Sequence, residues 1–264
     1  MKNKKIIALA LSASLFSATA AFSQTATPAA APAPSGPGFN VAGGTLTLNL
    51  GVNSDYVFRG YEQNGGKPAV NGGFDFVRPL IGDTNIFIGN WDSMTKGGTP
   101  TVAGAHMEND YYAGLRRAFG PVSVDLGYIS VNYPSYTKSK ATENPNFGEY
   151  YTKVSFAPDK QPYTLGFQYA INDTGGYLSA QPKKYIDKNY FELDASYDFG
   201  TFQTNASYGI FEKDTDTLTL TASKSFYDIT FGASYINASK DNKTLSNLSK
   251  NTKEYFNLSA SKTF

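Results

Sequence analysis

The sequence predicts an all-β protein, a single antiparallel transmembrane β-barrel of about 12 strands with short periplasmic turns and longer outer loops. Three observations support this fold class. From Thr45 onward, apolar residues recur with a period of two, which is the period of a strand. The connections between the expected strands alternate between short and long. The 19 Tyr and 19 Phe residues are frequent near strand ends, as in the aromatic girdles of membrane barrels.

The N-terminal segment is expected to lie outside this fold. Lys2, Lys4 and Lys5 precede a short apolar stretch and then small residues up to Ser23, which predicts a secretory signal peptide over residues 1–23. The alternative is a membrane anchor, but the apolar run is shorter than the roughly 20 residues that a spanning helix needs. Residues 24–44 are rich in Ala and Pro and predict a flexible periplasmic spacer, which leaves residues 45–264 for the barrel.

Alternation places the expected strands in order along the rest of the chain. The third is ambiguous, because Ile86 and Ile88 compete with Phe87 and Trp91 for the same face. The expected ranges are 45–58, 69–78, 85–94, 105–117, 121–133, 147–156, 162–172, 189–199, 201–211, 217–226, 229–236 and 253–264.

The connections after even-numbered and odd-numbered strands differ in length. Those after even-numbered strands are short: 79–84, 118–120, 157–161, 200 and 227–228. Those after odd-numbered strands are mostly longer and polar: 59–68, 95–104, 134–146, 173–188, 212–216 and 237–252. An even number of strands puts both ends of the barrel on the short-turn side, which is the periplasmic side in outer-membrane barrels.

Alternation alone does not decide which face points inward. A membrane barrel is favoured because a 12-stranded interior is wider than the eight-stranded barrel that side chains just fill. Acidic residues in mid-strand also suit a wet interior, and lipid forces strands to pair all round. A soluble periplasmic β-sandwich or ligand barrel is the alternative.

Composition excludes several classes of site. The chain has no cysteine and one histidine, so thiolate metal sites and multi-histidine centres are impossible. The net charge of +1 gives no electrostatic footprint for nucleic acid. We find no phosphate loop or dinucleotide fingerprint, and we expect no cofactor, no metal and no nucleic-acid partner.

The alternation of inward and outward positions along each strand predicts a pore lining that is mostly acidic. Such a lining favours a mild preference for cations. The alternative is that these charges pair across strands and only hold the wall together. The predicted pore-lining residues are Asp55, Asp75, Glu108, Asp110, Arg116, Asp125, Glu149, Lys153, Glu192 and Asp194.

Two further residues are placed at the pore mouth, Arg59 and His106. Arg59 lies four residues after Asp55 and is roughly 13 Å from it along a strand, so each must find another partner, and we favour a loop anchor for Arg59. Some outer-membrane barrels are lipases with a histidine and a serine in close register. Here His106 is followed by Met107-Glu108, so we expect no catalytic residue and no enzyme.

A family resemblance covers roughly residues 45–135. Ser54–Gly60 (SDYVFRG) followed by YEQ resembles the first-strand signature of the TorF family, a group of porin-like proteins from proteobacteria. Pro68–Phe76 (PAVNGGFDF) resembles the second strand of that family, Gly89-Asn90-Trp91 its Gly-x-Trp element, and Asn132-Tyr133-Pro134 its Tyr-Pro loop motif. The resemblance implies an outer-membrane porin-like barrel. It indicates the architecture of this protein better than it indicates a substrate.

The last strand and the loops suggest partners. Phe256, Leu258, Ala260, Lys262 and Phe264 share one face, and a terminal aromatic residue is similar to the signal read by the bacterial barrel-assembly machinery. Lysines in the outer loops could meet anionic lipopolysaccharide, although solvated surface charge explains them better.

We therefore expect an outer-membrane pore for passive diffusion of small hydrophilic solutes or ions. The passage would be narrowed by inward loops or side chains. A closed or plugged barrel with a structural, receptor or adhesin role is the alternative.

Overall fold

The computed structural model describes residues 38–96, 104–134, 146–173, 189–212, 215–240 and 252–264. Within these ranges every regular element is a β-strand. None of the described segments forms a helix long and apolar enough to span a bilayer. The strands are β1 (Phe39–Val41), β2 (Gly44–Asn53), β3 (Val57–Phe58), β4 (Tyr61–Glu62), β5 (Ala69–Ile81), β6 (Thr84–Met94), β7 (Met107–Phe119), β8 (Val122–Asn132), β9 (Phe147–Phe156), β10 (Tyr163–Asn172), β11 (Asn189–Asp198), β12 (Gln203–Phe211), β13 (Thr215–Phe226), β14 (Ile229–Lys240) and β15 (Thr252–Thr263).

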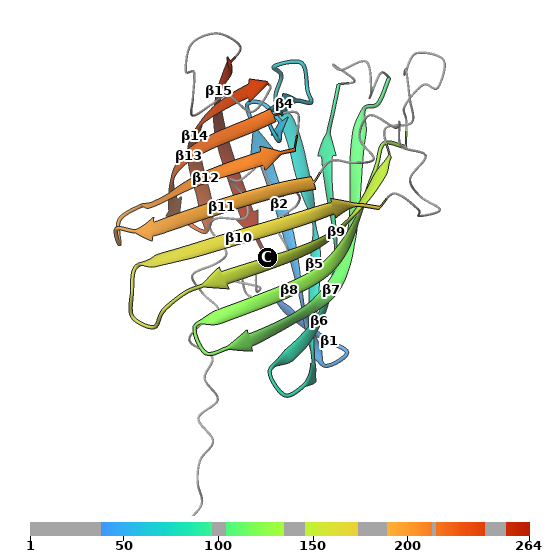
Figure 1. Cartoon of the computed structure of the whole chain (residues 1–264), viewed down its shortest axis with the longest axis vertical. Helices are drawn as coiled ribbons and strands as arrows, with labels where there is room; N and C mark the ends of the chain where they lie inside the picture. The colour runs from blue at the N-terminus through green and yellow to red at the C-terminus, as the bar shows by residue number, and fades with distance from the viewer. Residues whose placement is uncertain (1–37, 97–103, 135–145, 174–188, 213–214, 241–251) are drawn as a thin grey trace, which may run out of the picture.

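Twelve of these strands form one closed antiparallel barrel (Figure 1). Each strand from β5 to β15 pairs with its neighbour in the sequence, and β2 closes the ring by pairing with β15 on one edge and β5 on the other. Hairpin β3–β4 is not part of the wall. The expected 12-stranded antiparallel barrel is thus confirmed.

Alternate residues separate an apolar outer face from a polar inner face. Leu50, Leu193 and Phe256 point outward and are 55%, 62% and 74% exposed, whereas Thr47 and Asp75 point inward and are buried. In β6, Ile86 and Ile88 are exposed and Phe87 is buried, which resolves the ambiguity in that strand. An exposed apolar band around a closed barrel is the arrangement that lipid requires.

The short connections lie at one end of the barrel, as expected. They are 82–83, 120–121, 157–162, 199–202 and 227–228, at the lower and left side of Figure 1. At the other end the connections are 54–68, 95–106, 133–146, 173–188, 212–214 and 241–251, of which only 212–214 is short.

The barrel begins earlier in the chain than residue 45. Phe39–Val41 forms β1, which turns at Ala42-Gly43 and pairs with β2, so the expected spacer over 24–44 was wrong at its C-terminal end. Because β5 occupies one edge of β2, β1 lies on the edge that β15 also uses. The backbone of Phe264 exchanges two hydrogen bonds with Leu48. On the same edge of β2, residues 44–46 pair with β1 instead of β15. The predicted signal peptide lies outside the described residues.

The first strand ends earlier than expected. We predicted a strand over 45–58, but β2 ends at Asn53, and after Ser54, which still hydrogen-bonds to Leu258 of β15, the chain leaves the wall. The physical reason is that Ser54, at the next outward position after Val52, interrupts the apolar face, and the residues after it find partners inside the barrel.

Candidate functional site: a hairpin across the barrel interior

Asn257 on β15 holds the point where the chain turns inward. Its side-chain oxygen accepts hydrogen bonds from the Ser54 hydroxyl (3.0 Å) and the Asp55 backbone N–H (3.2 Å). The Asp55 carboxylate in turn accepts from the Tyr56 backbone N–H at 2.7 Å. Burial raises the pKa of the Asp55 carboxyl, this hydrogen bond opposes the rise, and Glu62 adds to it. The backbone is thus fixed at the exit from the wall.

A two-residue turn makes the tip of the hairpin. Phe58 pairs with Tyr61, and Arg59 and Gly60 between them have φ angles of 46° and 80°. Two left-handed residues give the type I′ turn that suits the twist of a hairpin. A Cβ atom at Gly60 would lie 2.7 Å from Ala238 Cβ and 2.8 Å from Thr215 Cγ2, so glycine is required by both conformation and space.

The Arg59 guanidinium docks on the opposite wall. It donates to both Glu149 oxygens, at 2.6 and 2.7 Å, and both side chains are 2% exposed. Its central carbon lies 4.0 Å from the Tyr190 ring centroid, 4.9 Å from that of Phe58 and 5.4 Å from that of Phe211. Burial alone would lower the pKa of Arg59, but the Glu149 carboxylate outweighs it and this pKa is raised.

The hairpin therefore reaches from one side of the interior to the other. Arg59 contacts β9, β11 and β12, while Gly60 packs against side chains of β13 and β14. The Tyr255 hydroxyl of β15 donates to the Gly60 carbonyl at 3.4 Å. Backbone hydrogen bonds also hold the return strand of the hairpin. The Gln63 N–H donates to the Tyr56 carbonyl, and the Lys96 N–H donates to the Gln63 carbonyl. The first outer connection thus forms a crossbar inside the barrel.

Tyrosine hydroxyls solvate several of the inward carboxylates. Glu108 accepts from Tyr56 at 2.7 Å and from Tyr133 at 2.5 Å. The other inward pairs of this kind are Tyr112 with Asp75, at 2.5 Å, and Tyr190 with Glu192, at 2.6 Å. A neutral phenol satisfies a carboxylate without cancelling its charge. These hydroxyls therefore leave the interior with a surplus of acid.

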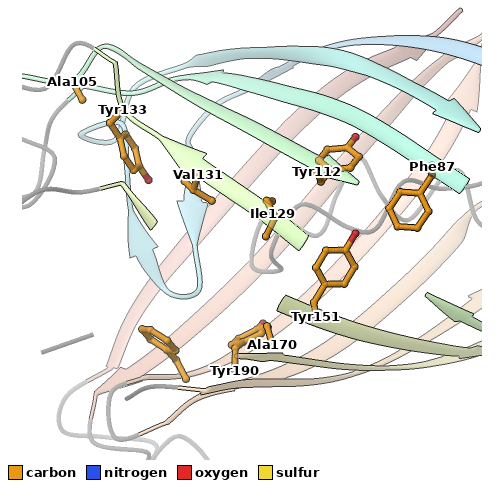
Figure 2. Packing of buried hydrophobic residues seen from close by; sticks show 10 residues of the cluster. Phe87, Ala105, Tyr112, Ile129, Val131, Tyr133, Tyr151, Ala170 and Tyr190 are labelled. Atoms are coloured by element: carbon orange, nitrogen blue, oxygen red, sulfur yellow. The ribbon is translucent and has the colours of Figure 1, made fainter. Parts of the chain in front are cut away.

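The tyrosines also form the packed part of the interior. Figure 2 shows Phe87, Tyr112 and Tyr151 grouped together, and Tyr190 beside Ala170. The same cluster includes Ile129 and Val131 of β8. The charged and aromatic side chains thus share one wall, from β5 to β12.

The opposite wall is different in chemistry. The inward positions of β13, and of β14 up to residue 238, are Thr, Ser, Gly, Ile236 and Ala238, and those of β2 are Thr, Asn and Gly. Thr221 and Ser234 share a hydrogen bond across strands at 2.9 Å. The described interior is therefore acidic on one side and hydroxyl-rich on the other.

All of the predicted pore-lining residues that lie on strands are on the inner face of the barrel. Arg116 and Asp125 form a bidentate ion pair across β7 and β8, at 2.7 and 2.6 Å. Lys153 lies within electrostatic range of Glu192 and Asp194. The Asp110 carboxyl is fully buried, and neither of its oxygens has a hydrogen-bond partner in the described part of the chain.

The residues expected nearer the mouth are placed differently. Asp55 does not lie on a strand, because β2 ends before it, and it belongs to the base of the crossbar. Arg59 is a buried anchor rather than an exposed mouth residue, because Glu149 draws its side chain inward. His106 is exposed just before β7, and its carbonyl accepts from the Thr95 N–H at 3.1 Å.

Several functional side chains were missed by sequence reasoning. Tyr56, Tyr133 and Tyr190 were given no role of their own, but they point inward and hold carboxylates. For Tyr133 and Tyr190, an inward position shared with acidic residues of the same strand is the signal that could have found them, whereas Tyr56 has the parity of the outward residues Leu50 and Val52. Tyr190 and Glu192, for example, are two residues apart on β11.

The solved structures most similar in shape include outer-membrane barrels. Outer-membrane phospholipase A from Escherichia coli is 11% identical, with 83% of this chain and 88% of that one covered and a TM-score of 0.50. A structure from a study of in-meso crystallization of membrane proteins is 10% identical, covers 83% of both chains and has a TM-score of 0.51. The KdgM porin is 7% identical, with 83% and 99% covered and a TM-score of 0.49. At these identities the likeness concerns the fold alone.

Sequence comparison gives a family. No curated protein matches the chain. Residues 40–262, which include the crossbar and all but the last residue of the barrel strands, match the Gcw_chp family, described as a bacterial protein of unknown function. The chain therefore belongs to the Gcw_chp family of bacterial proteins.

Proposed function

We propose that this protein is an outer-membrane porin through which small hydrophilic solutes or ions diffuse passively. The observation that carries the proposal is a closed 12-stranded barrel with an apolar outer face and a polar inner face. The resemblance of Ser54–Gly60 to the TorF signature remains a prediction and supports the same function. The proposal includes no catalytic residue and no cofactor.

The crossbar formed by residues 54–68 is the constriction of this pore. It divides the interior near the outer end, where Arg59 meets Glu149. Solute would pass where the crossbar leaves room, or when it moves. The predicted lining carries eight acidic residues, including Asp55 of the crossbar, and Arg59, Arg116 and Lys153 as cations. The surplus of negative charge favours a mild preference for cations.

A plugged barrel with a structural, receptor or adhesin role is the second candidate. A specific observation favours it, because the crossbar is anchored on both walls by a buried ion pair and by the packing of Gly60. In either case we propose an outer-membrane location, contact with lipid and lipopolysaccharide, and recognition of the strand ending at Phe264 by the barrel-assembly machinery.

The experiment is single-channel recording in a planar bilayer, with residues 24–264 refolded from denaturant and a salt gradient across the membrane. Discrete current steps with a reversal potential of the sign expected for cations support the porin. A reversal potential of the opposite sign contradicts the assigned lining. A protein that inserts and shifts its gel mobility on heating, but passes no current, supports the plugged barrel.

A further inference from the structure

The place where Arg59 docks is built mainly by the barrel wall. Of the described contacts, Glu149 comes from β9, Tyr190 from β11 and Phe211 from β12, whereas Phe58 belongs to the hairpin. Tyr190 is fixed in turn by its hydrogen bond to Glu192 at 2.6 Å. Three of these four side chains therefore come from the wall rather than from the hairpin. The hairpin contributes the guanidinium that fills it.

The chemistry of this pocket is selective for a guanidinium group. Two carboxylate oxygens at 2.6 and 2.7 Å from two guanidinium nitrogens form a bidentate, fork-to-fork contact, which an ammonium cannot reproduce. Aromatic faces on the flanks favour a delocalised, weakly hydrated cation. Glu192 adds negative charge nearby. The pocket therefore recognises guanidinium over ammonium or a metal ion.

The group that fills the pocket is held by a small element. Hairpin β3–β4 has two residue pairs, and Arg59 itself has a left-handed φ of 46°, a conformation that is unfavourable for a residue with a side chain. As part of the same chain, Arg59 competes with free ligands at an effective concentration in the millimolar range. A free guanidinium compound could compete with it only at comparable concentrations.

We propose that the pocket formed by Glu149, Tyr190 and Phe211 is a binding site for a guanidinium-bearing solute, which Arg59 occupies in its place when the crossbar is seated. This rests on the proposed function, in that the solute must reach the barrel interior. Binding of the solute and seating of the crossbar are then mutually exclusive, so a guanidinium solute favours the displaced crossbar.

The test is chemical rescue of Arg59→Ala with methylguanidinium chloride, which carries the tip of the arginine side chain. The refolded variant is heated in detergent with 0 to about 50 mM ligand at constant ionic strength, and the unfolding midpoint is measured. We expect a midpoint below wild type that rises with methylguanidinium, saturates, and regains at least half of the loss. Methylammonium is the matched control and should give no saturable rise.

Two further variants make the result specific. Arg59→Ala/Glu149→Gln should lose the rescue, because the carboxylate fork is gone, whereas Arg59→Ala/Asp125→Asn, which alters another inward carboxylate, should keep it. If Arg59→Ala does not refold alone, its refolding yield with either ligand gives the same comparison. Equal rescue by methylammonium, or rescue that survives Glu149→Gln, overturns the proposal.

The outcome is independent of conductance. Rescue in a protein that passes no current would leave the site standing and contradict the porin. Current steps without rescue would leave the porin standing and contradict the site.

Discussion

A single methyl group at Gly60 should unseat the crossbar. In Gly60→Ala the new Cβ atom would lie 2.7 Å from Ala238 Cβ, 2.8 Å from Thr215 Cγ2 and 2.9 Å from Thr217 Oγ1. These contacts are well inside van der Waals separation, and overpacking of this kind costs about 1–3 kcal/mol. The left-handed φ of 80° adds about 1 kcal/mol for any residue with a Cβ.

Gly66→Ala separates the two effects. Gly66 lies in the same connection with a φ of 64°, but a Cβ there would meet nothing within 4 Å. It therefore carries the conformational cost without the clash. The difference between the variants should be the clash alone, about 1–3 kcal/mol, which corresponds to about a 5- to 150-fold change in the population of the displaced crossbar.

Trypsin provides the assay, because it cleaves after Arg59 and the wild-type side chain is 2% exposed. When opening and closing are fast, the cleavage rate follows the population of the open form. The rate after Arg59, read by mass spectrometry on the refolded protein, should rise by this factor in Gly60→Ala relative to Gly66→Ala. Heat-dependent gel mobility confirms that the barrel is intact. Equal cleavage rates in the two variants would refute the assigned contact between Gly60 and the wall.

Other changes test other parts of the structure. Asp110→Asn replaces a buried carboxyl that has no hydrogen-bond partner among the described residues. The free energy of unfolding in urea should therefore rise by about 1 kcal/mol. A decrease in this free energy would show that the charge of Asp110 is needed. Leu193→Arg puts a charge on the outer face in mid-strand and should lower the free energy of unfolding in lipid by about 2–4 kcal/mol. Asn205→Arg puts the same charge on the inner face and should lower this free energy much less. Equal losses in the two variants would contradict the assigned faces. Because the folded pKa of Asp55 is raised, its contribution to stability should fall as pH rises from the ordinary value of 3.8 through the folded value, and Asp55→Asn should remove that part of the pH dependence of the unfolding midpoint.

The wall of the barrel could be predicted from the sequence because each strand carries its own signal. Leu46, Leu48, Leu50 and Val52 recur at every second position, and lipid requires this of each strand separately. The same parity placed Asp75 and Glu192 on the inner face. Most strand ends agreed to within a few residues for the same reason, but β2 ends at Asn53 rather than at residue 58.

The crossbar could not be predicted because its contacts join distant parts of the chain. Arg59 and Glu149 are 90 residues apart, and no periodicity relates them. The local signals were the polar Ser54 at an outward position and the Arg59-Gly60 turn, and both also fit an ordinary strand and loop. The role of the inward tyrosines was missed for a similar reason, since Tyr56 and Glu108 meet only when the hairpin folds inward.

The shared edge of β2 bears on how the chain could be reconnected. β1 and β15 both run antiparallel to β2 on the same edge, so Phe264, opposite Leu48, is followed in line by Phe39, opposite Leu46. A link of one residue from Phe264 to Phe39, placed opposite Thr47, would turn the two segments into one continuous strand. Circular permutants with this join, opened in the 120–121 or 227–228 turn, should keep every strand pairing of the barrel.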